Sequence, residues 1–139
     1  MEPIQSFTEV QLMLNRYFNA LDSRDYPTLL DCLTDDVDWK VSSVRSGRAD
    51  VAQAMEERPA NAVVRHLVTN LDLRAEGDEL SAFFLLSTFV HFTVEGDALP
   101  YPIAPPVIVA DMRAKIVSTP DGPKMRQLLA SIIFKKPDA

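Results

Sequence analysis

Two histidines are the residues of this sequence best suited to acid–base chemistry. His66 and His91 are the only histidines among its 139 residues. Imidazole is the side chain that ordinarily gains or loses its proton closest to neutral pH, and enzymes commonly pair it with a carboxylate. The carboxylate fixes which ring nitrogen carries the proton and stabilises the imidazolium that forms. The two histidines are therefore candidates for moving a proton.

The residues that follow His66 indicate that it lines a cavity. In a strand, the side chain of His66 shares a face with Asn70 and with two others, Val68 and Asp72. The opposite face is purely apolar and consists of Leu67, Leu71 and Leu73. Because polar atoms are buried only with partners, the first face is more typical of a cavity wall than of a packed core. Alternatively, His66 serves stability alone, and Asn70 bonds to neighbouring backbone instead of orienting a substrate oxygen.

Asp22 is a carboxylate that needs a hydrogen-bond donor. It lies just past the expected end of the first helix, where the helix dipole disfavours negative charge. The same residue could instead serve the Asp-Ser-Arg-Asp turn, residues 22–25, that ends this helix. Both roles remain open for Asp22.

Three further residues are candidates with competing interpretations. His91 lies near the end of a strand, where it could donate a proton or simply be solvated. Tyr101 belongs to a stiff, proline-rich segment, residues 99–106, which either covers a pocket mouth or only connects two strands. Trp39 is expected in the core, where it could also contact a ligand. The acidic residues at 35, 36 and 38 lack a second ligand set, so we expect no metal there.

Helices in the first half and strands in the second must position these residues. Apolar residues recur with helical spacing up to Leu21, with Thr8 expected as the N-cap. A short helix is expected from Tyr26 to the acidic run at 34–36, and a third from 47 to 57. A strand at 37–41 and four long strands at 64–75, 80–94, 107–118 and 124–135 complete the pattern. Tight turns between the long strands predict an antiparallel sheet, and the whole chain, residues 1–139, is expected to be one α+β domain.

The strand at 80–94 is apolar on both of its faces. One alternate set contains Phe83, Leu85 and Phe89, and the other contains Ala82, Phe84, Leu86, Val90 and Phe92. An antiparallel sheet with one wet face would instead alternate apolar and polar residues. The few helices can cover only one side of the sheet. We therefore predict a homodimer that packs sheet against sheet.

The chain resembles the NTF2-like superfamily, in particular its SnoaL-like branch, which includes scytalone dehydratase. The order of the elements carries the resemblance, together with residues 17–26, Asp38-Trp39 and residues 65–70. It implies a cone of three N-terminal helices packed on a curved antiparallel sheet that encloses a pocket for a small apolar molecule. It also implies that Asp22 and His66 form a hydrogen-bonded pair that acts as the base.

The resemblance extends to a second histidine and departs at the tyrosines. Scytalone dehydratase has a further pocket histidine, and His91 stands at a comparable position. The tyrosines that polarise the substrate carbonyl in that enzyme correspond here to Leu21 and Trp39, which carry no hydroxyl. Tyr101 is the phenol that could replace them.

The sequence contains no phosphate-binding glycine loop, nucleotide fingerprint, zinc spacing or nucleophile elbow. We therefore expect acid–base chemistry without a cofactor: a lyase or isomerase acting on a small apolar carbonyl compound. His66 would be the base, Asp22 its orienting partner, and His91 or Tyr101 the proton donor. Two alternatives are a non-catalytic small-molecule-binding domain and a structural dimerisation subunit.

Charge and cysteine content exclude some partners. With 14 basic and 20 acidic residues the net charge is −6, which argues against binding nucleic acid. No apolar stretch approaches the roughly 20 residues that span a bilayer, so no membrane partner is expected. A single cysteine and the absence of a secretory signal favour the cytoplasm.

Overall fold

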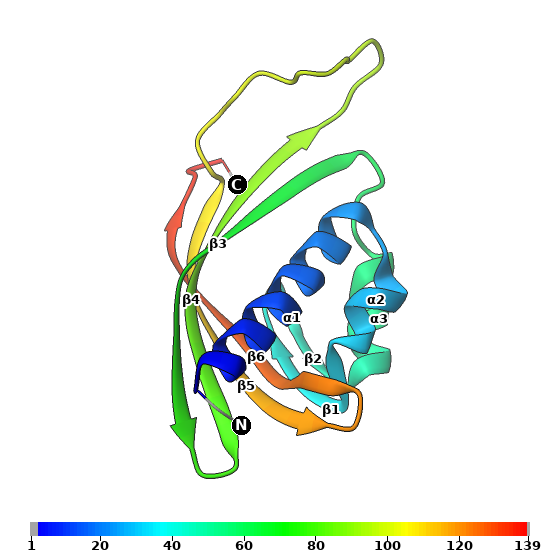
Figure 1. Cartoon of the computed structure of the whole chain (residues 1–139). Coiled ribbons are helices and arrows are strands. Elements are labelled where there is room, and N and C mark those ends of the chain that lie inside the picture. Colours follow the sequence, from blue (N-terminus) through cyan, green and yellow to red (C-terminus); the bar gives the residue numbers. More distant parts are fainter. Residues whose placement is uncertain (1–2, 139) are drawn as a thin grey trace.

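The computed structural model describes residues 3–138 and shows helices packed on one side of a bent sheet (Figure 1). The helices are α1 (Pro3–Ser23), α2 (Tyr26–Asp31) and α3 (Arg48–Glu56). The strands are β1 (Leu33–Lys40), β2 (Val44–Ser46), β3 (Ala62–Glu76), β4 (Glu79–Phe92), β5 (Ile108–Thr119) and β6 (Gly122–Lys135). The helix-covered side is called the inner face below, and the opposite side the outer face. This arrangement is the NTF2-like cone that the sequence predicted.

The six strands form one sheet in the order β2-β1-β6-β5-β4-β3. Neighbouring strands run antiparallel except β1 and β6, which are parallel. The expectation of a wholly antiparallel sheet is therefore wrong at this one pair. Parallel neighbours need a long connection, and here α3 and three long strands lie between them in the sequence.

Local boundaries differ from the sequence prediction at two helices. Thr8 is not an N-cap, because α1 is already helical from Pro3. Helix α2 is capped as its sequence suggests: the Asp25 carboxylate accepts hydrogen bonds from the Thr28 backbone at 3.4 Å and the Thr28 hydroxyl at 2.7 Å. The acidic residues 34–36, expected to end this helix, lie in β1 instead.

The core lies between the helices and the inner face of the sheet. Its fully buried members include Val10, Leu14 and Tyr17 of α1, Leu29 of α2, Val51 of α3, and Ala82, Ala114 and Leu128 of the sheet. Burying a large aliphatic or aromatic side chain contributes about 1.5–3 kcal/mol. The long apolar face of α1 therefore fixes this helix across the sheet.

A bulge in β3 reverses the alternation of its side chains. The register between β3 and β4 shifts between Thr69 and Asp72, and Asn70 adopts a left-handed backbone with φ of 59°. Val68 before the bulge and Leu71 after it both pack against the core. The prediction that Asn70 shares a face with His66 is therefore wrong, since the extra residue turns the later part of the strand over.

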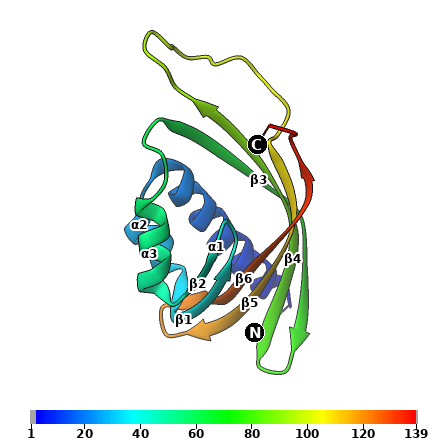
Figure 2. The same ribbon diagram turned by 180° about the vertical axis from the view of Figure 1, so that it is seen from behind.

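The connection between β4 and β5, residues 93–107, extends beyond the end of the sheet (Figures 1 and 2). It contains the proline-rich segment of the sequence. Leu99 and Ile103 in this connection are strongly exposed. The segment is thus an arm that projects from the sheet, and Figure 2 shows that it lies away from the helices.

Candidate functional site

Two hydrogen bonds join Asp22 and His66 on the inner face. The His66 Nδ1 atom lies 2.5 Å from Asp22 Oδ1, and the His66 backbone N–H donates to Asp22 Oδ2 at 2.8 Å. Each side chain is only 9% exposed. The structure thus brings together the two residues that the sequence paired.

The end of α1 positions Asp22 against the start of β3. Asp22 lies in the last turn of α1, and Arg24, with a backbone φ of 60°, reverses the chain immediately afterwards. The Arg24 guanidinium donates to the carbonyl oxygens of Pro59 at 2.6 Å and Ala62 at 2.9 Å. These bonds tie the helix end to the strand that carries His66.

The two donors of His66 offset an unfavourable location for a carboxylate. A negative charge at a helix C-terminus is disfavoured by the dipole, and a buried carboxylate needs hydrogen-bond donors. The Asp22 carboxylate accepts two hydrogen bonds from His66, one from its backbone and one from its ring. The Phe18 ring, one turn earlier in α1, lies 5.4 Å from the His66 ring and shields the pair.

The hydrogen bonds leave one ring nitrogen of His66 available. An ionised carboxylate can only accept, so Nδ1 carries the proton in this contact and Nε2 of a neutral ring becomes the acceptor. Nε2 has no partner within residues 3–138. The one fully buried side-chain nitrogen without a partner in that range is Arg48 Nε, so His66 Nε2 retains access to solvent. This is the geometry of a general base.

Two aromatic rings of the inner side lie near the pair. The Phe18 and Phe84 rings meet edge to face with centroids 6.0 Å apart. Four of the hollows formed by the described residues are lined by neither Asp22 nor His66, and the two of these between α1 and β3 measure about 110 Å³ and 340 Å³. The enclosed pocket expected beside His66 is not among them and stays a prediction.

Trp39 lies in the core, where it is hydrogen-bonded to a phenol that sequence reasoning overlooked. Trp39 is 2% exposed, and its Nε1–H donates to the Tyr17 hydroxyl at 3.0 Å. Burial raises the pKa of Tyr17 to about 12, although the hydrogen bond from Trp39 lowers it. Tyr17 is next to Phe18 and was counted only as part of the apolar helix face. Its phenol lies on the inner side of the sheet, as does that of Tyr26 in α2, which accepts a hydrogen bond from Arg58 at 3.0 Å.

His91 and Tyr101 lie together, but on the outer face. His66 pairs with Thr88 across the β3–β4 ladder, and cross-strand partners share a face. His91 is three residues from Thr88, so it points to the opposite side. Its ring stacks on Tyr101 with centroids 4.3 Å apart. The structure therefore does not bring His91 or Tyr101 to the Asp22–His66 pair.

Asp97 completes this outer cluster. The Asp97 carboxylate lies 3.0 Å from His91 Nε2 and accepts the Val94 backbone N–H at 2.8 Å. The bond from Val94, and then that from His91, lowers the pKa of Asp97. The three side chains fix the base of the arm.

Other reactive groups show no site of their own. Burial raises the pKa of the Cys32 thiol to about 11, which makes it a packing residue. Within residues 3–138, no three His, Cys, Asp or Glu side chains gather as metal ligands. No helix in that range has the length and apolar character to cross a membrane.

Solved structures of low sequence identity share this fold. A candidate scytalone dehydratase from Novosphingobium aromaticivorans has a TM-score of 0.81 at 12% identity, covering 96% of this chain and 87% of that chain. ActVI-ORFA from Streptomyces coelicolor has a TM-score of 0.76 at 19% identity, covering 92% and 97%. A protein of unknown function with a cystatin-like fold from Nostoc punctiforme has a TM-score of 0.77 at 13% identity, covering 100% and 98%.

Sequence comparison identifies the family. A search of curated proteins found no match. The pattern of the SnoaL-like domain, in contrast, matches residues 2–126, which is nearly the whole chain. The chain therefore belongs to the SnoaL-like domain family, whose members bind small molecules.

Proposed function

We propose that the protein is a cofactor-independent lyase or isomerase that acts on a small apolar carbonyl compound. The observation that carries this proposal is the Asp22–His66 contact, which leaves Nε2 of the imidazole free to accept a proton. The family and the fold support small-molecule binding, and the pair supplies the chemistry.

In this mechanism His66 Nε2 removes a proton from the carbon next to the substrate carbonyl. Asp22 holds the ring and stabilises the imidazolium that forms. For a lyase, the electron pair of the broken C–H bond forms a C=C bond while a β-hydroxyl leaves, and the imidazolium gives its proton to that oxygen to release water. For an isomerase, the proton returns to another carbon. His91 and Tyr101 take no part, because they lie on the outer face.

Proton exchange tests the first step without knowledge of the natural substrate. In D₂O, the protein should accelerate exchange of the α-protons of 2-tetralone, a cyclic apolar ketone, as measured by NMR. His66→Ala should reduce the rate to that of buffer, and Asp22→Asn should lower it by a factor on the order of 10²–10⁴. His91→Ala is the control and should retain the full rate. Full exchange by the His66→Ala variant would refute the mechanism.

A second candidate is a binding domain without catalysis. The positions of His91 and Tyr101 on the outer face favour it, because they leave the Asp22–His66 pair without either of the proton donors that the sequence suggested. In that case no ketone would exchange faster with protein than without it, whereas His66→Ala would still change the affinity for a bound molecule.

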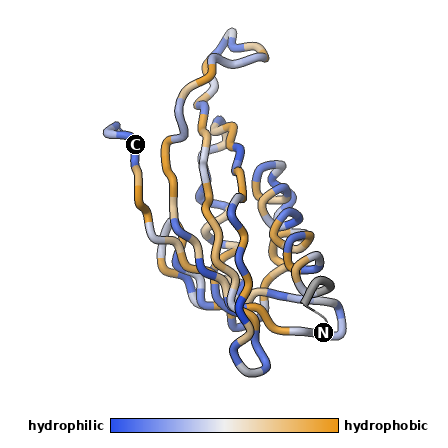
Figure 3. Tube along the Cα trace, turned by 60° about the vertical axis from the view of Figure 1, so that its left-hand side comes forward, coloured by the Kyte–Doolittle hydropathy of each residue, from blue (hydrophilic) through white to orange (hydrophobic). Residues whose placement is uncertain are grey.

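We further propose that a second copy of the chain covers the arm end of the outer face. Leu67, Ser87, Val109 and Phe134 form one row across β3, β4, β5 and β6 on this face. Leu67 is 52% and Phe134 68% exposed, and Figure 3 shows a hydrophobic trace leading to the C-terminus. Light scattering at micromolar concentration should give the mass of a dimer, and a monomeric mass would contradict the proposal.

We also propose that residues 1–139 form one domain and that the protein functions in the cytoplasm.

A further inference from the structure

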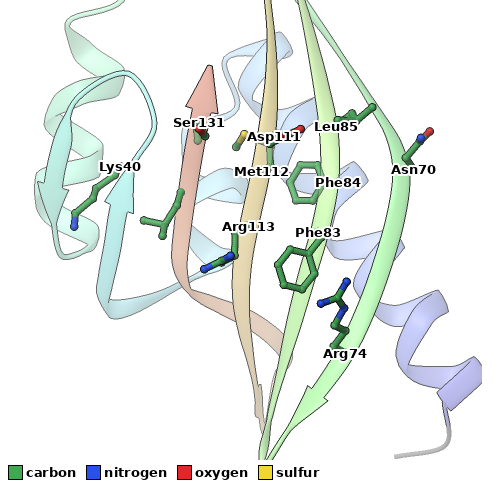
Figure 4. A pocket seen from close by; sticks show the side chains of 12 residues that line it. Lys40, Asn70, Arg74, Phe83, Phe84, Leu85, Asp111, Met112, Arg113 and Ser131 are labelled. Atoms are coloured by element: carbon green, nitrogen blue, oxygen red, sulfur yellow. The ribbon is translucent and has the colours of Figure 1, made fainter. Parts of the chain in front are cut away.

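A hollow of about 760 Å³ lies on the outer face, towards the end of the sheet opposite the arm (Figure 4). Two adjacent rows of cross-strand neighbours contribute to its lining. One row contains Leu85, Asp111 and Ser131, and the other contains Phe83, Arg113, Leu129 and Lys40. The sheet itself separates this hollow from Asp22 and His66.

The centre of the hollow is apolar. Phe83 and Leu85 of β4 and Leu129 of β6 are half-buried side chains that line it. A small-molecule site usually combines such an apolar floor with a few polar groups that fix orientation. The size of the hollow also lies within the usual range of ligand pockets.

Positive charges border this apolar floor on both sides. The guanidinium carbons of Arg74 and Arg113 lie 4.7 Å and 5.3 Å from the centre of the Phe83 ring, and Figure 4 shows the two on either side of it. Lys40 of β1 lines the opposite end. Within the described part of the chain, neither the Lys40 ammonium nor the Arg113 guanidinium forms a hydrogen bond or an ion pair. Only Arg74 has an acidic partner, Asp72, at 3.5 Å.

The charge of the hollow opposes that of the whole chain. Three cationic side chains and one carboxylate, that of Asp111, line it, whereas the chain carries a net charge of −6. Exposed charges alone bind weakly. Guanidinium groups beside an apolar surface, in contrast, suit a ligand that has both a negative charge and an apolar part.

We propose that this hollow is a second binding site, distinct from the Asp22–His66 pair, for an amphipathic anion. An apolar and preferably aromatic body lies on Phe83 and Leu85. The carboxylate, sulfonate or phosphate of the ligand accepts hydrogen bonds from Arg113 and Arg74, or from Lys40 at the other end.

Two fluorescent probes of similar size and different charge test the site. The anionic probe is 8-anilinonaphthalene-1-sulfonate, and the neutral one is N-phenyl-1-naphthylamine. The double variant Arg74→Gln/Arg113→Gln should bind the sulfonate roughly tenfold more weakly, because it removes two exposed charges that each contribute modestly to binding. Its affinity for the neutral probe should stay within about twofold. Phe83→Ser should weaken both probes, because it removes the aromatic floor.

Two control variants locate the binding. Arg65→Gln removes one positive charge, half of that removed by the double variant, from an exposed residue of β3 outside the hollow and should leave both affinities unchanged. His66→Ala should also leave both probe affinities unchanged. The second-site proposal can therefore fail independently of the catalytic proposal. The inference is wrong if the double variant binds the sulfonate as tightly as the original chain, or loses both probes equally. It is equally wrong if the double variant changes the sedimentation mass without changing sulfonate affinity, since a second copy would then occupy the hollow.

Discussion

The Asp22–His66 pair on the inner face and the cations of the outer hollow differ in their hydrogen-bond partners. On the inner face, Asp22 bonds twice to His66, and Trp39 donates to Tyr17. On the outer face, Arg113 and Lys40 have no hydrogen-bonding partner in the described part of the chain. A buried polar group without a partner is costly, whereas an exposed one is hydrated by water. The inner pairs therefore maintain the fold, whereas Arg113 and Lys40 remain available to a ligand.

The largest effect on stability is expected at Asp22. Asp22→Ala leaves the His66 backbone N–H and Nδ1 without their acceptor in a mostly buried location. The free energy of unfolding should fall by about 2–4 kcal/mol, as measured by urea denaturation. Asp31→Ala is the matched control: its carboxylate is exposed and Lys124 is its one ion-pair partner within residues 3–138, so the change should stay within about 0.5 kcal/mol. Equal losses in the two variants would show that the burial and the two hydrogen bonds of Asp22 do not add to stability.

Tyr17 should make the protein sensitive to alkaline pH. Its pKa rises from 10.0 to about 12 on folding, so the unfolded chain loses the phenol proton first. The stabilisation is complete below pH 10 and disappears as pH rises towards 12, with a loss of about 2–3 kcal/mol. Tyr17→Phe, compared with the original chain by denaturation at several pH values, should lack this dependence. An unchanged pH profile in the variant would show that another group titrates.

Single changes on the outer face should alter stability little. Arg113→Gln removes an exposed cation that has no acidic partner in residues 3–138, so the free energy of unfolding should change by less than about 0.5 kcal/mol. Thermal denaturation checks this value. A loss comparable to that of Asp22→Ala would mean that the outer charges stabilise the fold as well.

The smallest effect is expected at the base of the arm. Folding lowers the pKa of Asp97, so its contribution is present above the ordinary value of 3.8 and disappears as pH falls through the lowered one. At neutral pH, Asp97→Asn should speed hydrogen exchange at the Val94 amide and leave His66 unaffected. Equal protection of Val94 in both proteins would show that the carboxylate does not hold the arm.

The sequence predicted the elements well because their periodicity is local. The four long strands and the helical first half follow directly from apolar spacing. Asp22 and His66, 44 residues apart, could be paired only through the family resemblance, since spacing alone does not relate a helix end to a distant strand. The predicted role of the pair remains to be tested.

The incorrect predictions concern residues whose face or partner the local pattern does not specify. Simple alternation placed Asn70 beside His66, but the bulge at Asn70 reverses every later side chain in β3. His91 was placed by its separation from His66, which does not specify the face. Tyr17 was missed because a phenol within an apolar helical stripe is indistinguishable from a core residue until its hydroxyl partner, Trp39, is known.

The parallel contact of β1 with β6 has a consequence for synthesis on the ribosome. β1 is made early, yet its neighbour on one side is the last strand of the sheet. Until residues 122–135 emerge, the nascent chain exposes that edge and the apolar surface beside it. Pairing between strands so far apart in the sequence slows folding. Until it is complete, the exposed surface can bind chaperones or aggregate.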